Sequence, residues 1–213
     1  MQNNTVNNVV VKKGNIRFST KELVMIGLLG AISTVLMFFE FPVPLSPTFV
    51  KMDFSELPSI LGGFMMGPIA GLFIILIKIA LNFVLNGTTT MGVGELANMI
   101  GSISYMLPAV LIYRRNTTNK VMRFSLATGT IFVSGVTLIS NLFFIFPIYV
   151  KLYGMSMEMI VSMGRVTNPY VTDLFSMMLF SMLPFNLFKY GVVSIFFLVV
   201  YKRLEKVIRN NIC

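Results

Sequence analysis

Residues 51–104 read KMDFSELPSILGGFMMGPIAGLFIILIKIALNFVLNGTTTMGVGELANMIGSIS, a stretch in which acids, amides and lysines stand among segments apolar enough to lie in a bilayer. Lys78 and Glu95 lie within those segments, and ionisable side chains at membrane depth are costly and rarely face lipid. We therefore predict that both residues belong to a buried polar site. The alternative is that they pair with each other and only hold helices together.

The composition of the whole chain predicts an integral membrane protein. Its 213 residues are 55% hydrophobic and 12% charged, and the mean hydropathy is +0.81, which is too apolar for an ordinary soluble domain. About six membrane helices of ~20 residues fit into this length, so we expect one all-α helical bundle. The sequence has no GxxxxGK[ST] motif, so an ATP-driven role would need partner chains.

Charge and residue usage exclude several classes of function. The net charge is +9, but the basic residues cluster beside apolar spans, which indicates membrane topology rather than nucleic-acid binding. Cys213 is the single cysteine and histidine is absent, which excludes a disulfide framework, a cysteine metal site, Ser-His catalysis and the HExxH motif. We predict a protein that is not an enzyme and that has no metal and no resident cofactor.

We expect the chain to divide into a mobile cytoplasmic tail over 1–18, a membrane domain over 19–205 and a basic cytoplasmic tail over 206–213. Ser19 or Thr20 can cap the first span, and Glu22 lies in its first turn, where the helix dipole favours an anion. The span is longer than a signal-peptide core and no small-residue cleavage site follows it, so we expect it to be retained.

An apolar loop over 42–52 follows the first span. Three prolines within it, at positions 42, 44 and 47, stop the helix. Its apolar side chains include Leu45 and Phe49, which are unusual in a loop. We predict that the loop folds back over the bundle as a lid; the alternative is that it rests on the lipid interface.

The apolar run over Leu57–Leu85 is too long for one span, because a helix of this length would measure ~43 Å against a hydrocarbon core of ~30 Å. Gly67 and Pro68 supply a break, and proline suits the first turn of a new helix. We predict a short helix from about Ser55 to Met66 and a full span from Pro68 to Leu85.

Further spans are expected from Gly92 to Arg115, from about Phe124 to Val150 and from about Thr172 to Tyr201, with a polar connection before the last. The positive-inside rule then tests the number of spans. The three basic clusters share the cytoplasmic side only if the apolar run Leu57–Leu85 crosses the membrane twice. We predict six spans with both termini in the cytoplasm. The basic clusters are Lys12, Lys13, Arg17 and Lys21; Arg114, Arg115, Lys120 and Arg123; and Lys202, Arg203, Lys206 and Arg209.

Polar side chains at helical spacing predict a cavity in the outer half of the bundle. Each of three sets lies on one helix face, and Asn141 lies in the same outer half. The sets are Lys78 with Asn82, Glu95 with Asn98 and Ser102, and Asn186 with Lys189. Pro184 can kink the last span and free backbone groups near that pair. The alternative is an interhelical hydrogen-bond network without a ligand.

Small residues recur on the first span. Gly27 and Ala31 are four residues apart, as are Gly30 and Thr34, on a neighbouring face. Small residues at this spacing allow close helix approach, either inside the bundle or to a partner protein.

The motifs KMDFSELPSILGGFMMGPIAG, GVGELANMIGS and LPFNLFK closely resemble the riboflavin-binding S component of energy-coupling factor (ECF) vitamin transporters, over residues 20–205. The resemblance implies six membrane helices, a multi-pass location in a prokaryotic plasma membrane and high-affinity capture of riboflavin from outside. It further implies that import requires docking to a shared membrane coupling protein and two ATPase subunits.

The resemblance also implies roles for single residues. It implies that the loop after the first span closes the site, and that Gly27 and Ala31, where the family pattern suggests an alanine pair, face the coupling protein. It puts the binding region on Leu45, Phe49, Asn141, Asn186 and Lys189. Together with the polar groups above and the motif matches, the predicted ligand-binding set is Leu45, Phe49, Lys51, Asp53, Lys78, Asn82, Glu95, Asn98, Asn141, Asn186 and Lys189.

Other functions stay open at this point. A stand-alone secondary transporter of a small amphipathic molecule usually shows repeated halves, which are not evident here. An intramembrane enzyme would have to use a Ser-Lys pair, because histidine and the GxSxG motif are absent. An S component for a different vitamin is a further alternative, since the residues alone do not distinguish flavin from another amphipathic molecule.

Overall fold

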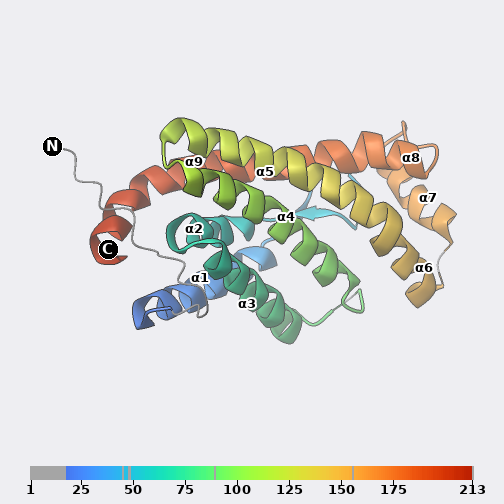
Figure 1. Ribbon diagram of the computed structural model, residues 1–213. Helices are drawn as coiled ribbons and strands as arrows, with labels where there is room; N and C mark the ends of the chain where they lie inside the picture. The colour runs from blue at the N-terminus through green and yellow to red at the C-terminus, as the bar shows by residue number, and fades with distance from the viewer. Residues whose placement is uncertain (1–17, 45, 48, 89, 155, 213) are drawn as a thin grey trace.

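The computed structural model describes residues 18–44, 46–47, 49–88, 90–154 and 156–212, with side chains up to residue 203, and these residues form a helical bundle (Figure 1). Two short strands pair antiparallel, and two π-helical segments, η1 and η2, interrupt the last long helices. The elements are α1 Thr20–Phe38, β1 Phe41–Pro42, β2 Lys51–Met52, α2 Glu56–Met66, α3 Pro68–Asn86, α4 Val93–Arg115, α5 Asn119–Ser140, η1 Asn141–Ile145, α6 Phe146–Tyr153, α7 Met157–Thr167, α8 Leu174–Met177, η2 Met178–Met182 and α9 Leu183–Ile212.

Five helical stretches among the described residues are long and apolar enough to cross a membrane. They are α1, α3, α4, the continuous run Asn119–Tyr153 and the run Leu174–Arg203. The helices α2 and α7 lie outside these stretches and have 11 residues each, so each is only ~16 Å long against a hydrocarbon core of ~30 Å. The all-α membrane bundle is therefore confirmed, while six crossings and the cytoplasmic placement of both termini stay predictions.

The predicted start of the first span is confirmed by its hydrogen bonds. The backbone N–H of Ser19 donates to Glu22 Oε2 at 2.8 Å, and the N–H of Glu22 donates to Ser19 Oγ at 3.3 Å. This reciprocal capping box satisfies two backbone donors that the helix itself leaves free.

The predicted break between α2 and α3 is also confirmed. Gly67 has φ +110° and ψ 171°, a backbone conformation that is essentially restricted to glycine, and Pro68 begins α3. A side chain at position 67 would collide with the guanidinium of Arg114, which lies at the end of α4. The break is therefore packed against a third helix.

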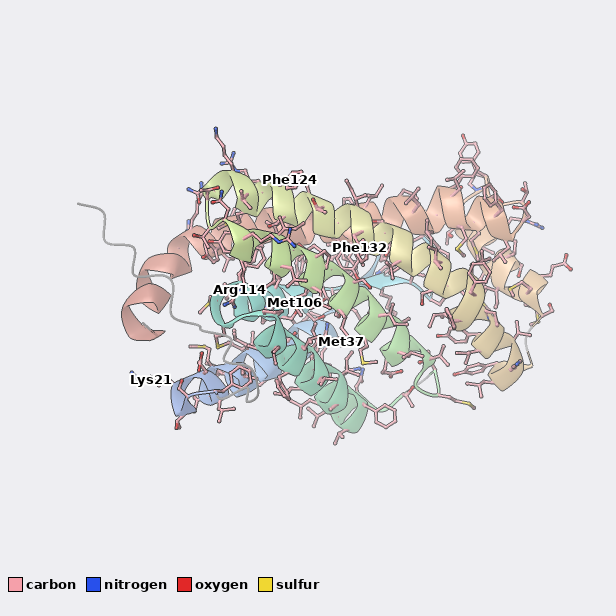
Figure 2. The ribbon with its side chains drawn as sticks, in the orientation of Figure 1. Lys21, Met37, Met106, Arg114, Phe124 and Phe132 are labelled. Atoms are coloured by element: carbon pink, nitrogen blue, oxygen red, sulfur yellow. The ribbon has the colours of Figure 1, made fainter. Side chains whose placement is uncertain are left out.

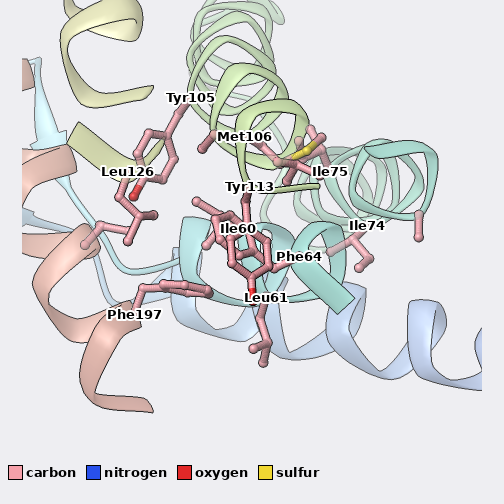
Figure 3. Close-up of a cluster of buried hydrophobic side chains, with 14 of the residues drawn as sticks. Ile60, Leu61, Phe64, Ile74, Ile75, Tyr105, Met106, Tyr113, Leu126 and Phe197 are labelled. Carbon is pink, nitrogen blue, oxygen red and sulfur yellow. The ribbon is translucent and has the colours of Figure 1, made fainter. Parts of the chain in front are cut away.

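The short helix α2 lies at the centre of the packing (Figure 3). Its Phe64 ring stacks on Tyr113 of α4 with the ring centroids 4.5 Å apart and lies 4.8 Å from the Phe197 ring of α9. A Cβ atom at Gly71 of α3 would lie only 2.8 Å from the sulfur of Met106, so the glycine is needed for this close helix contact. Apolar side chains that face away from this core, such as Phe124 and Phe132, are exposed on the outside of the bundle (Figure 2).

The two ends of the bundle differ in character. Lys21 and Arg114 lie at the same end, which is also where α9 finishes (Figures 1 and 2). The opposite end holds α6, α7 and α8 (Figure 1), and a second buried apolar cluster joins them. The connection that we predicted as polar contains the helix α7, and α9 continues through the residues that we predicted as a basic tail.

Candidate functional site

The loop between α1 and α2 folds onto the bundle. Its hairpin β1–β2 brings Phe49 against Phe146 of α6, with the rings edge to face and their centroids 6.3 Å apart. Val50 packs against the second apolar cluster. The predicted lid thus lies on α6 in this structure, while Leu45, one of its predicted ligand-binding residues, lies outside the described residues.

Phe49 lines an aromatic pocket. Its empty volume is about 560 Å³, including the part that is open to solvent. Rings and apolar side chains dominate the wall, and Thr90 supplies a hydroxyl. A flat ring system with a polar edge fits such a lining. The pocket is lined by Phe49, Thr90, Phe146, Tyr149, Tyr153, Ile160 and Met163.

Lys189 of α9 forms a buried ion pair with Asp53, which directly follows β2. The Nζ to Oδ2 distance is 3.1 Å, and each side chain is 5% exposed. The other carboxylate oxygen of Asp53 accepts a hydrogen bond of 2.8 Å from the backbone N–H of Ser55. The end of the lid loop is therefore tied to the last helix, on the helix face that also carries Asn186.

Two of the predicted ligand-binding amides lie at π-helical segments. Asn141 begins η1, and Asn186 donates from Nδ2 to the carbonyl oxygen of Met182, the last residue of η2, at 2.9 Å. Asn186 is buried and Asn141 is half-buried. Single-turn π segments occur frequently at functional sites, because they re-aim side chains within an otherwise regular helix.

Lys78 pairs with Glu56. One of our two interpretations required a pair between Lys78 and Glu95, and the structure does not show that pair among the described residues. The Nζ of Lys78 lies 3.0 Å from Glu56 Oε1, 3.2 Å from Ser55 Oγ and 2.8 Å from Ser102 Oγ. The Lys78 side chain is 0% exposed and that of Glu56 is 1% exposed. All three ammonium donors are therefore matched within the protein.

The two buried ion pairs belong to one polar network. Ser55 joins them, because its backbone N–H donates to Asp53 and its hydroxyl accepts from Lys78. The hydroxyl of Ser33 in α1 donates to the backbone carbonyl of Ser55. The start of α2 is thus held by α1, α3 and α9. The sequence prediction missed Glu56, although it stands in the same DFSE motif as Asp53.

Glu95 and Asn98 make their hydrogen bonds with residues other than Lys189. Glu95 Oε2 accepts hydrogen bonds from Thr88 at 3.2 Å and from Thr90 at 3.0 Å, so it orders the α3–α4 loop at the rim of the pocket. Asn98, one turn further along α4, is half-buried, and its backbone carbonyl accepts from Ser102.

Two further candidates differ in burial. Lys51 is exposed and pairs with Glu40 across the base of the hairpin. Asn82 is buried one turn along α3 from Lys78, and its Oδ1 has no hydrogen-bond partner among the described residues. A buried acceptor of this kind is suited to a donor group that is supplied from outside the chain.

The small residues of α1 lie on two different faces of the helix. Gly30 packs closely on Ile77 of α3, inside the bundle. Gly27 and Ala31 are exposed on the outer surface, and a Cβ atom at Gly27 would meet no atom of the described residues within 4 Å. The two predicted docking residues therefore lie on a surface that the described part of the chain leaves uncovered.

Comparison with known proteins agrees with this architecture. The ECF transporter substrate-specific component family matches residues 21–201. A riboflavin transporter RibU of Staphylococcus aureus (strain TCH60) is 34% identical over 192 residues, which cover 89% of this chain and 93% of that protein. A riboflavin transporter FmnP of Bacillus subtilis (strain 168) is 33% identical over 130 residues, which cover 61% of this chain and 68% of that protein.

A solved structure gives the same result for the fold. It is the S component of a bacterial ECF transporter, with a TM-score of 0.70 and 32% sequence identity, and the match covers 88% of this chain and 96% of that one. The family match and the apolar spanning helices make this a multi-pass protein of the plasma membrane. The chain belongs to the family of substrate-specific S components of ECF transporters.

Proposed function

We propose that this chain captures riboflavin from outside the cell and mediates its ATP-dependent uptake with an energy-coupling module. Two relatives that are about one-third identical are riboflavin transporters, and the match to RibU of Staphylococcus aureus extends over nearly the whole chain. Riboflavin is then the transported cargo and not a resident cofactor.

The observation that carries the proposal is the link between the lid, the pocket and a buried lysine. Phe49 lines the aromatic pocket, and four residues later Asp53 holds the ammonium of Lys189. Aromatic walls suit the flat isoalloxazine ring, and the ring carbonyls and nitrogens are acceptors for an ammonium or an amide. The hydroxyl groups of the ribityl chain need polar partners, which Asn141 and Asn186 offer on the neighbouring α5–η1 and α9 helices.

The orientation follows from charge. The end that carries Lys21 and Arg114 faces the cytoplasm by the positive-inside rule, so α6 and α7, which line the pocket, lie toward the outside (Figures 1 and 2). Both termini are then cytoplasmic and α2 with α3 forms the second and third of six membrane helices. The exposed face of α1 with Gly27 and Ala31 is the docking surface for the membrane coupling protein.

The proposal is tested by purifying the protein and recording its visible absorption spectrum, since a retained flavin absorbs visible light. Ligand-free protein is then titrated into riboflavin, and the quenching of flavin fluorescence gives the affinity. We expect saturable quenching at one site per chain. Protein that is folded but neither retains nor quenches riboflavin would contradict the proposal, and a vitamin that raises its Tm instead would identify it as an S component for another substrate.

A further inference from the structure

The last membrane helix contains a backbone defect that is repaired from another part of the chain. In a regular helix the carbonyl of Phe180 would accept from the N–H of residue 184, but Pro184 has no N–H. The side chain of Asn168 takes over this role, because its Nδ2 donates to the Phe180 carbonyl at 2.9 Å. The same nitrogen lies 3.1 Å from Ser181 Oγ.

Asn168 is built rigidly into the connection between α7 and α8. It is 3% exposed, and its backbone N–H closes α7 by donating to Gly164. Its Oδ1 accepts a hydrogen bond of 3.0 Å from the backbone N–H of Tyr170. Both ends of the side-chain amide are thus satisfied, and Asn168 fixes η2 relative to α7, which lines the aromatic pocket through Ile160 and Met163.

The defect lies directly before the candidate ligand-binding face of α9. Leu183 donates its N–H to the carbonyl of Met178, five residues back, so the helix is locally widened by the π segment. Asn186 then bonds to Met182 at the end of that segment, and Lys189 follows one turn later. The width of η2 therefore sets the direction in which Asn186 and Lys189 point.

We propose that Asn168 is a positioning residue for the ligand site: it replaces the backbone donor that Pro184 lacks, and it thereby holds η2 in the geometry that aims Asn186 and Lys189. Asn168 acts through these two residues and does not touch the ligand itself. The inference rests on the proposed function, because it uses riboflavin as the ligand of Asn186 and Lys189.

The first experiment compares Asn168→Ala with Asp173→Ala. Asp173 caps α8 in the same connection, with its Oδ1 2.7 Å from the N–H of Ser176, but it is exposed and leaves the Phe180 carbonyl satisfied. Both variants should lower the Tm of the ligand-free protein. Only Asn168→Ala should weaken riboflavin binding, by about tenfold or more, in a fluorescence-quenching titration. Equal affinity in the two variants would overturn the proposal.

The second experiment adds Pro184→Ala to Asn168→Ala. Alanine restores an N–H at position 184, which gives the Phe180 carbonyl a helical partner, so the double variant should regain the Tm that Asn168→Ala loses. Its riboflavin affinity should stay at least about tenfold weak, because a regularised helix turns Asn186 and Lys189 away from their native direction. Recovery of affinity together with Tm would make Asn168 a stabilising residue only and overturn the positioning role.

The unsubstituted protein separates the two claims. If it does not bind riboflavin, the proposed function fails and this inference fails with it. If it binds riboflavin and both Asn168→Ala and the double variant bind equally well, only the positioning role is lost. A double variant that regains neither Tm nor affinity would show that the hydrogen bond to the Phe180 carbonyl is not the contribution that Asn168 makes. This result would also overturn the inference.

Discussion

Lys189 is the residue on which the proposed ligand site depends most directly. Replacing it with Met keeps most of the apolar stem and removes the charge. If its ammonium donates to a flavin acceptor, the loss of a charge-assisted hydrogen bond should cost ~1.5–3 kcal/mol of binding free energy, or roughly ten- to a hundredfold in Kd. Quenching of flavin fluorescence, with a thermal melt of the ligand-free protein beside it, measures both effects.

The control must separate ligand binding from the loss of a buried charge pair. Lys189→Met leaves Asp53 buried without its partner, and breaking such a pair is strongly destabilising. Asp53→Asn in the same chain should therefore restore Tm without restoring affinity. Glu56→Gln is the matched control, because it breaks the other buried ion pair and should lower Tm alone. Unchanged affinity in a folded Lys189→Met protein would remove this lysine from the site.

At the residue scale, the sequence predicted which side chains share a helix face better than it predicted which residues contact each other. The spacing of Asn186 and Lys189 placed them on one buried face, and the structure agrees. The ion-pair partner of Lys78 was not predicted. This partner, Glu56, lies 22 residues away in the sequence, and the packing of α2 brings it to Lys78. Helical spacing carries no information on such a contact, so Glu56 was missed.

Among the secondary-structure elements, the α2–α3 break offers a direct test. Gly67→Ala should destabilise the protein by ~1–3 kcal/mol, because the φ of +110° is strained for any residue with a Cβ atom. The side chain would also displace Arg114. Gly27→Ala is the control, since position 27 is helical and its surroundings are open. Equal Tm values for the two variants in detergent would show that the break tolerates a side chain.

Helix bounds were predictable where local chemistry decides them, and less so elsewhere. The helix cap at Ser19 or Thr20 and the break at Gly67 were predicted from local signals, and the structure confirms a cap at Ser19 and the break. The π segments η1 and η2 were not predicted, because an i to i+5 bond differs little in sequence from an ordinary turn. The helix α7 was also not predicted. Glu158 and Arg165 near its two ends make the segment look polar in sequence, although one face of the helix is apolar and packs in the second apolar cluster.

For the whole molecule, the sequence predicted the membrane bundle from the length of its apolar runs and the placement of its basic clusters. Its Lys21 and Arg114 do lie at one end, as the predicted topology requires (Figure 2). The central position of α2 was not predictable, because its two glycine-rich contacts with α3 and α4 form only once the bundle assembles. Apolar length identifies the helices of such a bundle but not their neighbours.

Dependence on partners is a property of the whole molecule. The chain has no GxxxxGK[ST] motif, so we expect it to bind riboflavin but not to concentrate it. Reconstituted alone into liposomes, it should show saturable binding and no ATP-driven accumulation of riboflavin. Sustained ATP-dependent uptake by the pure protein would contradict the proposed function, and ion-driven flux would favour a stand-alone secondary transporter.

The exposed face of α1 is where the molecule should meet its coupling partner. Small residues on a membrane helix permit close approach of a second helix, and none of the residues that the structure describes covers Gly27 and Ala31. Gly27→Leu or Ala31→Leu should therefore reduce uptake by liposomes that contain the complete energy-coupling module and leave flavin affinity unchanged. Gly30→Leu is the contrasting variant, because Gly30 packs against Ile77 and a larger side chain there should lower Tm. Parallel loss of uptake and flavin affinity in the Gly27 and Ala31 variants would mean that this face acts on the ligand site and is not a docking surface.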